Sequence, residues 1–152
     1  MKDRVFVDTN IWIYALTESK VEDNKEKREI SLSLLESIVA QEKAIYASVQ
    51  VINECHWNFI RKFNLSDATA IRIIQENIIA IFQITTVTLN TYLLSNRIRQ
   101  PYCLSFWDSL IVASALENQC SILYTEDMQN GQVIEDKLRI VNPFKEKDSR
   151  SC

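Results

Sequence analysis

The feature that most constrains this fold is the alternation of short apolar runs, which are typical of β-strands, with longer segments of helical spacing. The strand-like runs cover 4–7, 44–48, 83–89, 121–125 and 138–141. Helical segments lie between most of these runs, and a helix that joins two neighbouring strands makes a crossover connection, which leaves the strands parallel. The order therefore predicts an α/β domain with a central, mainly parallel sheet of four to five short strands.

The helical segments are expected over 9–17, 30–41, 49–63, 67–82, 90–100 and 105–119. With one glycine and two prolines, the chain has too few turn residues for a typical β-sandwich or barrel, so composition also favours a helix-rich fold. The charged stretch ESKVEDNKEKRE, residues 18–29, is interpreted as a solvated loop or a helix entrance.

The 152 residues suit one compact domain, which we place at 1–144, and the polar tail, 145–152, is expected to be disordered. No apolar stretch approaches the roughly 18 residues of a membrane-spanning helix. Asp8 interrupts the only early apolar run, so no signal peptide is expected either. We therefore expect a cytoplasmic protein that makes no membrane contact.

Cysteine and histidine do not form a metal-binding pattern. The chain has four Cys and one His, no C-x-x-C pair and no zinc-ligand spacing. Cys55 stands beside His56, which could suggest a thiol nucleophile with its base. Because consecutive residues on a helix point about 100° apart, we do not favour that hypothesis.

Acidic residues instead follow two of the predicted strands. Asp8 comes directly after 4–7, and Asp127 follows 121–125 by two residues. The carboxyl ends of parallel strands meet at one edge of a sheet, where α/β folds bind ligands. If the two strands are neighbours, both carboxylates project at the same rim. Each acid also has a plainer interpretation, as a helix cap for Asp8 and as a turn residue for Asp127.

Two further acids lie on predicted helices. Ser105 and Asp108 form S-x-x-D, a capping-box-like spacing that explains Asp108 as a helix cap but leaves it able to face the rim. Glu54 lies opposite the apolar stripe of its helix and could be a solvated residue paired with Arg61. These interpretations explain each acid separately, but not four acids after two strands, at a helix start and on a helix face.

Four segments, in order and at family-like spacing, resemble the PIN-domain nucleases, in particular the VapC-type toxin ribonucleases of bacterial toxin–antitoxin pairs. They are VFVDTNIWIYA, INECHWNFIRK, FWDSLIVASALENQC and ILYTEDMQNGQ. The resemblance covers nearly the whole chain and implies a three-layer α/β/α fold. It also implies that the catalytic residues and metal ligands are Asp8, Glu54, Asp108 and Asp127. Asn10 and Thr125 match polar supporting positions, and Glu126 is an additional acid beside the matching position.

The chemistry of four carboxylates agrees with this implication. Close carboxylates repel each other, and a divalent cation that prefers oxygen ligands, Mg²⁺ or Mn²⁺, removes the repulsion. Such a cation can bind a phosphate oxygen, activate water and stabilise a leaving oxygen, which suits phosphodiester hydrolysis. The resemblance implies endonucleolytic cleavage of RNA, an antitoxin protein that covers the cleft, and a homodimer.

An acidic protein needs local basic residues to approach RNA, because the net charge is −3 and the pI about 5.2. The candidates for phosphate contacts are Arg61, Lys62, Arg72, Arg97 and Arg99. Three tryptophans, Trp12, Trp57 and Trp107, lie near the acids in sequence. They could stack on bases, but packing in the core or a dimer interface is the expectation for them.

Other functions remain open at this point. An aspartyl phosphatase also begins with a strand that ends in Asp, but its Asp-x-Asp pattern would need an acid where Asn10 stands. A receiver-type signalling domain would carry its acceptor Asp in mid-chain and a Lys near the last strand. A catalytically silent PIN-like module that binds RNA or a protein is the principal alternative to the ribonuclease.

Overall fold

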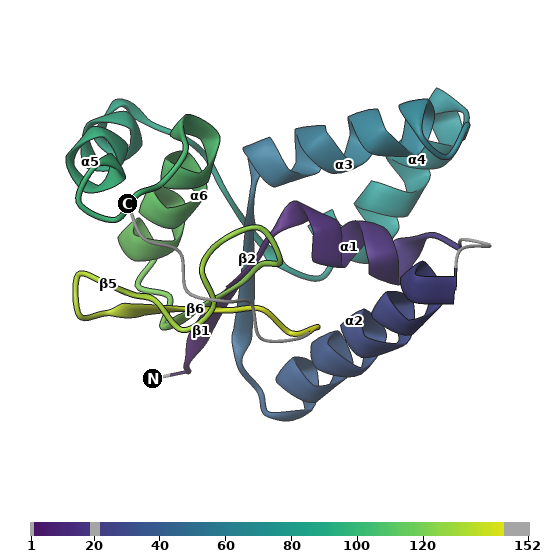
Figure 1. The fold of residues 1–152 in the computed structure, drawn as a ribbon. Coiled ribbons are helices and arrows are strands. Elements are labelled where there is room, and N and C mark those ends of the chain that lie inside the picture. Colours follow the sequence, from purple (N-terminus) through teal and green to yellow (C-terminus); the bar gives the residue numbers. More distant parts are fainter. Residues whose placement is uncertain (1, 19–21, 145–152) are drawn as a thin grey trace.

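The computed structural model describes residues 2–18 and 22–144 (Figure 1). Its helices are α1 (Thr9–Leu16), α2 (Glu22–Ala40), α3 (Val49–Arg61), α4 (Asp67–Ile74), α5 (Leu89–Arg99) and α6 (Phe106–Glu117), and a π-helical turn, η1 (Gln75–Ile79), follows α4. Its strands are β1 (Arg4–Val7), β2 (Ala44–Ser48), β3 (Gln83–Thr85), β4 (Ile122–Tyr124), β5 (Val133–Ile134) and β6 (Leu138–Val141).

The strands form one sheet in the order β3-β2-β1-β4-β6-β5. All neighbouring pairs are parallel except β5 with β6, which confirms the predicted α/β fold with a mainly parallel sheet. The sheet has six strands, so the expected four to five is an undercount. The missed strand is β5, whose two residues are too short to show any alternation of apolar and polar side chains.

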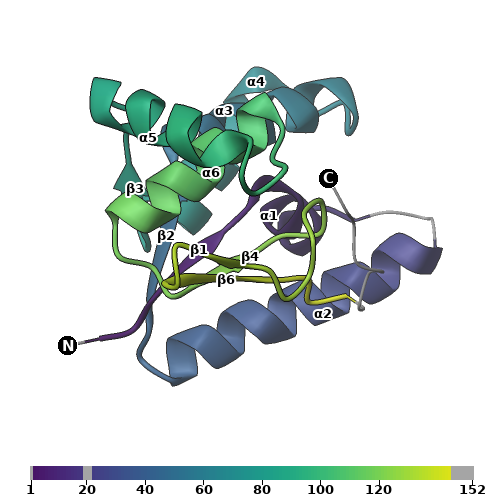
Figure 2. The same ribbon diagram turned by 60° about the vertical axis from the view of Figure 1, so that its left-hand side comes forward.

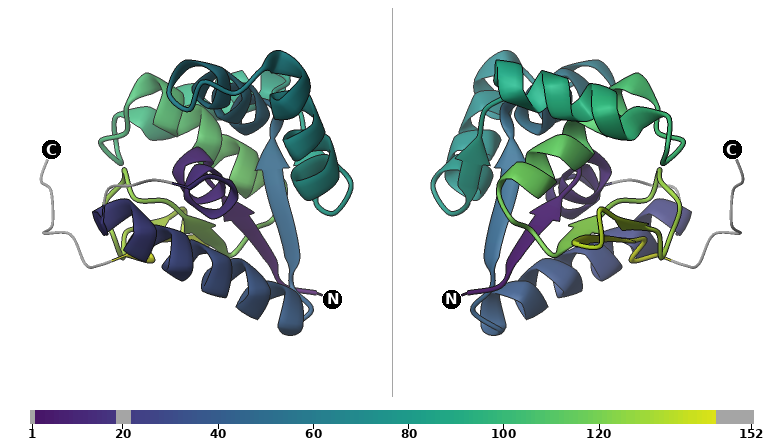
Figure 3. Two further views of the ribbon diagram at one scale, coloured as in Figure 1. Left: turned by 90° about the vertical axis from the view of Figure 1, so that its right-hand side faces the viewer. Right: turned by 90° about the vertical axis from the view of Figure 1, so that its left-hand side faces the viewer.

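Helices cover both faces of the sheet, which confirms the three-layer α/β/α arrangement. Figure 2 shows α2 along one face and α6 along the other, with α5 packed outside α6. The two views in Figure 3 show the same layers from opposite sides. The central strand β1 is apolar because it is buried between these layers, and Val5, Phe6 and Val7 are fully buried.

The order of the sheet brings β1 and β4 side by side, with Val5 paired to Ile122 and Val7 to Tyr124. Their carboxyl ends therefore lie at the same rim. At this rim α1 follows β1 without a loop, and Trp12 of α1 anchors the turn by donating its indole N–H to the carbonyl of Val7 over 3.0 Å. Trp12 is only 1% exposed and packs on Phe82, so it is a core residue.

Two other segments differ from the expectations. The charged stretch is not mainly a loop, because α2 begins at Glu22; residues 19–21 lie outside the described part of the chain. Lys27, within that stretch, forms an ion pair with Glu126 over 2.9 Å. The helix expected over 67–82 ends earlier, at η1, and the third strand is limited to Gln83–Thr85. The tail, 145–152, lies outside the described residues. No helix in the described ranges is long and apolar enough to cross a membrane.

Candidate functional site

The site begins with Asp8, which follows β1 and serves as the N-cap of α1. Its carboxylate accepts the backbone N–H of Thr9 over 2.7 Å at one oxygen and the hydroxyl of Thr125 over 2.8 Å at the other. The backbone N–H of Asp8 donates to the carbonyl of Tyr124 in β4, which ties this end of the two strands together. Asp8 is therefore both the predicted helix cap and a residue of the rim, and it is 7% exposed.

Asp127 lies in the turn after β4, close to the same rim. The amide of Asn10 donates to one of its carboxylate oxygens over 2.9 Å, and its backbone N–H donates to the Thr125 hydroxyl over 3.2 Å. The Thr125 hydroxyl thus contacts both Asp8 and the Asp127 backbone. Asn10 and Thr125, which the sequence suggested as supports, contact the predicted acids directly.

Glu54 reaches the rim from α3, a helix that starts at once after β2 because Ser48 caps it. One carboxylate oxygen accepts the Thr9 hydroxyl over 3.0 Å, and the other accepts the Gln50 amide over 3.1 Å. The suggested pairing of Glu54 with Arg61 is not what holds it. Thr9 and Gln50 were not identified from the sequence, where the only available signal was that Thr9 lies next to Asp8.

Asp108 lies in the first turn of α6, partly exposed. Its backbone N–H donates to the hydroxyl of Ser105 over 3.2 Å, so Ser105 is the N-cap and provides one half of the predicted capping-box pair. Its neighbour Trp107 lines a pocket that Glu54 also lines, so the start of α6 faces the Glu54 side of α3. Hydrogen bonds through Thr9, Asn10 and Thr125 link Asp8, Glu54 and Asp127. These hydrogen bonds do not include the Asp108 carboxylate.

Burial and neighbouring charge act on Asp8. Burial raises its pKa from 3.8 to about 7, the hydrogen bonds from Thr9 and Thr125 oppose that rise, and the charges of Glu54 and Asp127 add to it. Within residues 2–18 and 22–144, no Lys or Arg side chain pairs with Asp8. A buried carboxylate with two acidic neighbours and no basic partner is electrostatically unfavourable when ionised.

In this structure the acidic side chains do not converge on one metal-binding position. Among the described residues, no group of three or more Asp, Glu, His and Cys side chains is arranged so that it could hold a metal ion. Glu54 and Asp127 each accept hydrogen bonds from neighbouring polar side chains in this arrangement. Their oxygens would have to turn toward Asp8 to share one cation with it.

The cysteine that might have offered a nucleophile does not suit that role. Cys55 is fully buried, and burial together with the charges of Asp8 and Glu54 raises the pKa of its thiol well above the usual range. His56 is occupied on the other side of α3, where its ring nitrogen lies 2.7 Å from a carboxylate oxygen of Asp67. The thiol hypothesis is therefore excluded by geometry and by protonation.

Glu126, the additional acid, is held by a cluster that we call the Glu126 clamp: Tyr14, Lys27 and Glu126. The ammonium of Lys27 and the hydroxyl of Tyr14 contact different oxygens of Glu126, at 2.9 and 2.6 Å. Burial and the bond to Glu126 raise the pKa of Tyr14 to about 12, so the phenol remains a donor. The clamp ties α1 and α2 to the residue between Thr125 and Asp127.

The basic residues proposed for phosphate contacts lie in different settings. Arg97 pairs with Glu135 over 3.1 Å, and Arg99 stacks on Phe106 while donating to Ser109, which joins α5 to α6. Arg61 lies over the ring of Trp57. Lys62 and Arg72 are exposed at the end of α3 and on α4.

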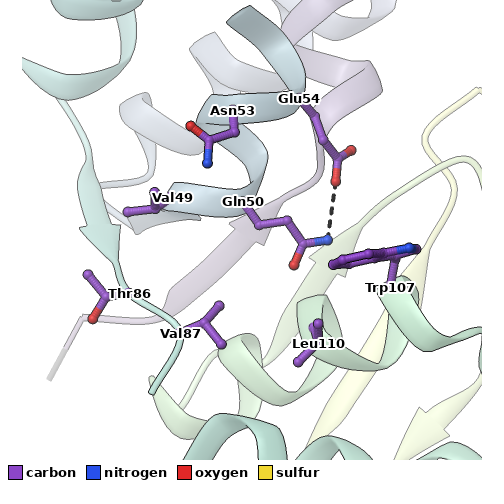
Figure 4. Close-up of a pocket in the computed structure, with 8 residues that line it drawn as sticks. All are labelled: Val49, Gln50, Asn53, Glu54, Thr86, Val87, Trp107 and Leu110. Atoms are coloured by element: carbon purple, nitrogen blue, oxygen red, sulfur yellow. Dashed lines mark hydrogen bonds between the residues drawn. The ribbon is translucent and has the colours of Figure 1, made fainter. Parts of the chain in front are cut away.

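A pocket of about 720 Å³ lies beside Glu54, and we call it the α3–α6 pocket (Figure 4). It lies between the start of α3, the loop after β3 and the start of α6. Its lining residues are Val49, Gln50, Asn53, Glu54, Thr86, Val87, Trp107 and Leu110. The close-up shows the Trp107 ring below the Gln50–Glu54 hydrogen bond. Trp107 is 64% exposed, so a ligand in the pocket can reach its ring.

Comparison with known proteins gives a family and a fold. The family model described as PIN domain matches residues 5–132. No curated protein sequence matches the chain significantly.

Among similar solved structures, FitAcB from Neisseria gonorrhoeae has a TM-score of 0.66 at 16% identity, over 92% of this chain and 98% of that one. The toxin VapC20 from Mycobacterium tuberculosis, described as cleaving the sarcin–ricin loop, has a TM-score of 0.63 at 16% identity, over 81% and 89%. A toxin–antitoxin complex from Klebsiella pneumoniae has a TM-score of 0.62 at 20% identity, over 94% and 99%. At these identities the structures establish the shared fold.

Proposed function

Because this chain belongs to the PIN domain family, we propose that it is a Mg²⁺- or Mn²⁺-dependent endoribonuclease, which hydrolyses phosphodiester bonds of RNA. The observation that carries the proposal is the environment of Asp8. This carboxylate is buried, has Glu54 and Asp127 as acidic neighbours, and has no basic partner among the described residues. A hard divalent cation bound beside Asp8 would neutralise its charge. No Lys or Arg of the described residues pairs with Asp8 to do so.

The donor set fits such a cation in its chemistry. The proposed ligands Asp8, Glu54, Asp108 and Asp127 offer only carboxylate oxygens, which Mg²⁺ and Mn²⁺ prefer. Thr125 fixes the Asp8 carboxylate, and Asn10 orients that of Asp127, as groups that support metal ligands usually do. When bound, the cation would stabilise the negative charge of the phosphate and lower the pKa of a water molecule. The chain itself would then need no nucleophilic side chain.

The side chains at the rim then have separate tasks. In hydrolysis the water oxygen forms a bond to phosphorus as the bond to the leaving ribose oxygen breaks, and one proton of the water passes through solvent to that leaving oxygen. Glu54 is exposed, held between Thr9 and Gln50, and suited to accept a hydrogen bond from that water and orient it. The buried Asp8 stays fixed, since both of its oxygens already accept hydrogen bonds from the chain.

We also propose that the protein is the toxin of a type II toxin–antitoxin pair and that it acts in the cytoplasm. The support is that similar folds occur in a toxin–antitoxin complex and in VapBC bound to promoter DNA from Rickettsia felis. The partner would be an antitoxin that covers the rim, and the protein would form a homodimer. Co-expression with the neighbouring small reading frame should give a stable complex that no longer cleaves RNA. Repeated failure to co-purify would argue for a solitary nuclease.

Cleavage of mixed RNA tests the ribonuclease. Wild-type protein should cut RNA internally with Mg²⁺ or Mn²⁺ and stop when EDTA is added, and Asp8→Asn should abolish the cutting. Asp136→Asn, which neutralises an exposed carboxylate in the turn between β5 and β6, is the matched control and should cut like the wild type. Equal cutting by Asp8→Asn would contradict the assigned site. Binding of RNA without any cutting by the wild type would favour the silent PIN-like module.

A further inference from the structure

We propose that the α3–α6 pocket is a nucleobase-binding subsite, which holds one unpaired base of the RNA strand next to the phosphate that is cut. The inference rests on the proposed ribonuclease function and adds how the substrate is held. Glu54 connects the pocket to the rim, because it lines the pocket and also accepts a hydrogen bond from Thr9, the residue next to Asp8. A nucleotide bound at the rim would therefore have this pocket beside it.

The walls of the pocket suit a flat apolar group and not a phosphate. Its apolar lining residues are Val49, Val87, Trp107 and Leu110, and no Lys or Arg is among the lining residues. The lining carries one acid, Glu54, which would repel a phosphate. The volume of about 720 Å³ lies within the roughly 300–1,000 Å³ range of small-molecule pockets, so a base with its ribose fits.

Trp107 supplies the surface on which a base would stack. Its indole is 64% exposed, whereas large aromatic side chains are usually well buried in a protein. Phe106 packs edge-on against it, with ring centroids 4.9 Å apart and an interplanar angle of 89°, so the indole is supported from one side. Unpaired RNA bases characteristically stack on exposed aromatic rings of this kind.

Polar groups at the pocket could recognise the edge of the base. The Gln50 amide donates its N–H to Glu54, which fixes the amide and leaves its carbonyl oxygen as an acceptor. Asn53, one turn along the same helix face, also lines the pocket (Figure 4). Side-chain amides pair with the donors and acceptors of base edges. Two amides beside an exposed indole therefore favour a base as the occupant.

The test uses ¹⁵N-labelled protein in EDTA, where no RNA is hydrolysed, so its result does not depend on activity. The indole N–H signals are assigned with Trp57→Phe and Trp107→Phe. Ribonucleoside monophosphates should shift the Trp107 signal, whereas ribose 5-phosphate, which lacks a base, should not. Trp12 is the internal control, because its indole is buried and its N–H donates to the carbonyl of Val7, and its signal should stay in place.

Kinetics give a second readout. Stacking contributes about 1–3 kcal/mol per base, so Trp107→Ala should raise KM for an RNA oligonucleotide roughly 5- to 150-fold. Tyr92→Ala, which removes an exposed aromatic ring of α5 outside the pocket lining, is the control and should leave KM unchanged. Asn53→Leu should alter which of the four monophosphates binds best. Because Trp107 and Asn53 are exposed, these variants should unfold at the wild-type urea concentration.

The outcomes separate this inference from the proposed function. If none of the four monophosphates shifts the Trp107 signal, the subsite is overturned. The same holds if the signal shifts only when a second copy of the chain or an antitoxin binds. Unchanged KM for Trp107→Ala with normal RNA cleavage would remove the subsite and leave the ribonuclease intact. Base-dependent shifts without RNA cleavage would keep the subsite and contradict the ribonuclease.

Discussion

Replacing Asp8 with Asn should stabilise the metal-free protein at pH 8. Burial raises the pKa of Asp8 from 3.8 to about 7, so the folded state holds this proton more tightly than the unfolded state. The cost of ionising the folded protein is therefore complete above about pH 7 and disappears as the pH falls toward 3.8. About three pKa units at 1.36 kcal/mol each give a cost of about 4 kcal/mol.

Asn removes that cost but weakens one contact. Its oxygen can still accept the Thr9 N–H, whereas its NH₂ cannot accept the Thr125 hydroxyl, and losing that hydrogen bond costs about 1 kcal/mol. The expected net gain is about 3 kcal/mol at pH 8 and under about 1 kcal/mol at pH 5, where little of the ionisation cost is left.

Urea denaturation in EDTA measures this gain at the two pH values. Asp136→Asn is the control, since this carboxylate is exposed and the substitution should not change the free energy of unfolding at either pH. The reasoning would be refuted if Asp8→Asn unfolded at the same or a lower urea concentration than the wild type at pH 8, or if its gain were equal at pH 5.

Three further predictions concern the same region. Mg²⁺ at ten times its Kd should stabilise the wild type by about 1.4 kcal/mol in thermal denaturation and leave Asp8→Asn unchanged; equal shifts would argue against a site at Asp8. Thr125→Val should cost about 1–3 kcal/mol in urea denaturation, because it removes the hydroxyl shared by Asp8 and the Asp127 backbone, and Thr125→Ser should recover most of the loss. Lys27→Met should destabilise by about 1–3 kcal/mol by leaving Glu126 half-buried without its ion pair, and adding Glu126→Gln should recover part of it; strictly additive effects would contradict the clamp.

The sequence predicts the central strand well because that strand is a continuous apolar run buried on both faces. Val5, Phe6 and Val7 form such a run, and the structure places them at the centre of the sheet. β5 escaped detection because two residues carry no periodicity, and its pairing with β6 depends on a turn in which Glu135 and Asp136 adopt φ values of 53° and 55°, a conformation that residues with side chains rarely take. The charged stretch proves to be the helix entrance and not the loop of the two interpretations, because its residues have a tertiary reason to be helical. Lys27 packs on Tyr14 and pairs with Glu126, contacts that local charge cannot reveal.

The candidate site was partly accessible from the sequence for a similar reason. Asp8 directly follows β1 and Asp127 lies in the turn after β4, so strand order alone brings them to one rim. Glu54 was harder, because helical periodicity placed it on a solvated face, and only the contact of α3 with α1 brings it to Thr9. Pairing partners such as Gln50, and the pocket next to it, depend on how three separate elements pack, which no local pattern encodes.

The account depends on a cation shared by carboxylates that are far apart in the sequence. The most direct measurement is anomalous X-ray diffraction from crystals soaked in Mn²⁺, with Asp8→Asn crystals soaked in parallel. The account predicts a strong anomalous peak within about 2.5 Å of carboxylate oxygens from Asp8 and at least one of the other three acids, and no peak there in the variant. Manganese peaks found only elsewhere on the wild-type surface would contradict it.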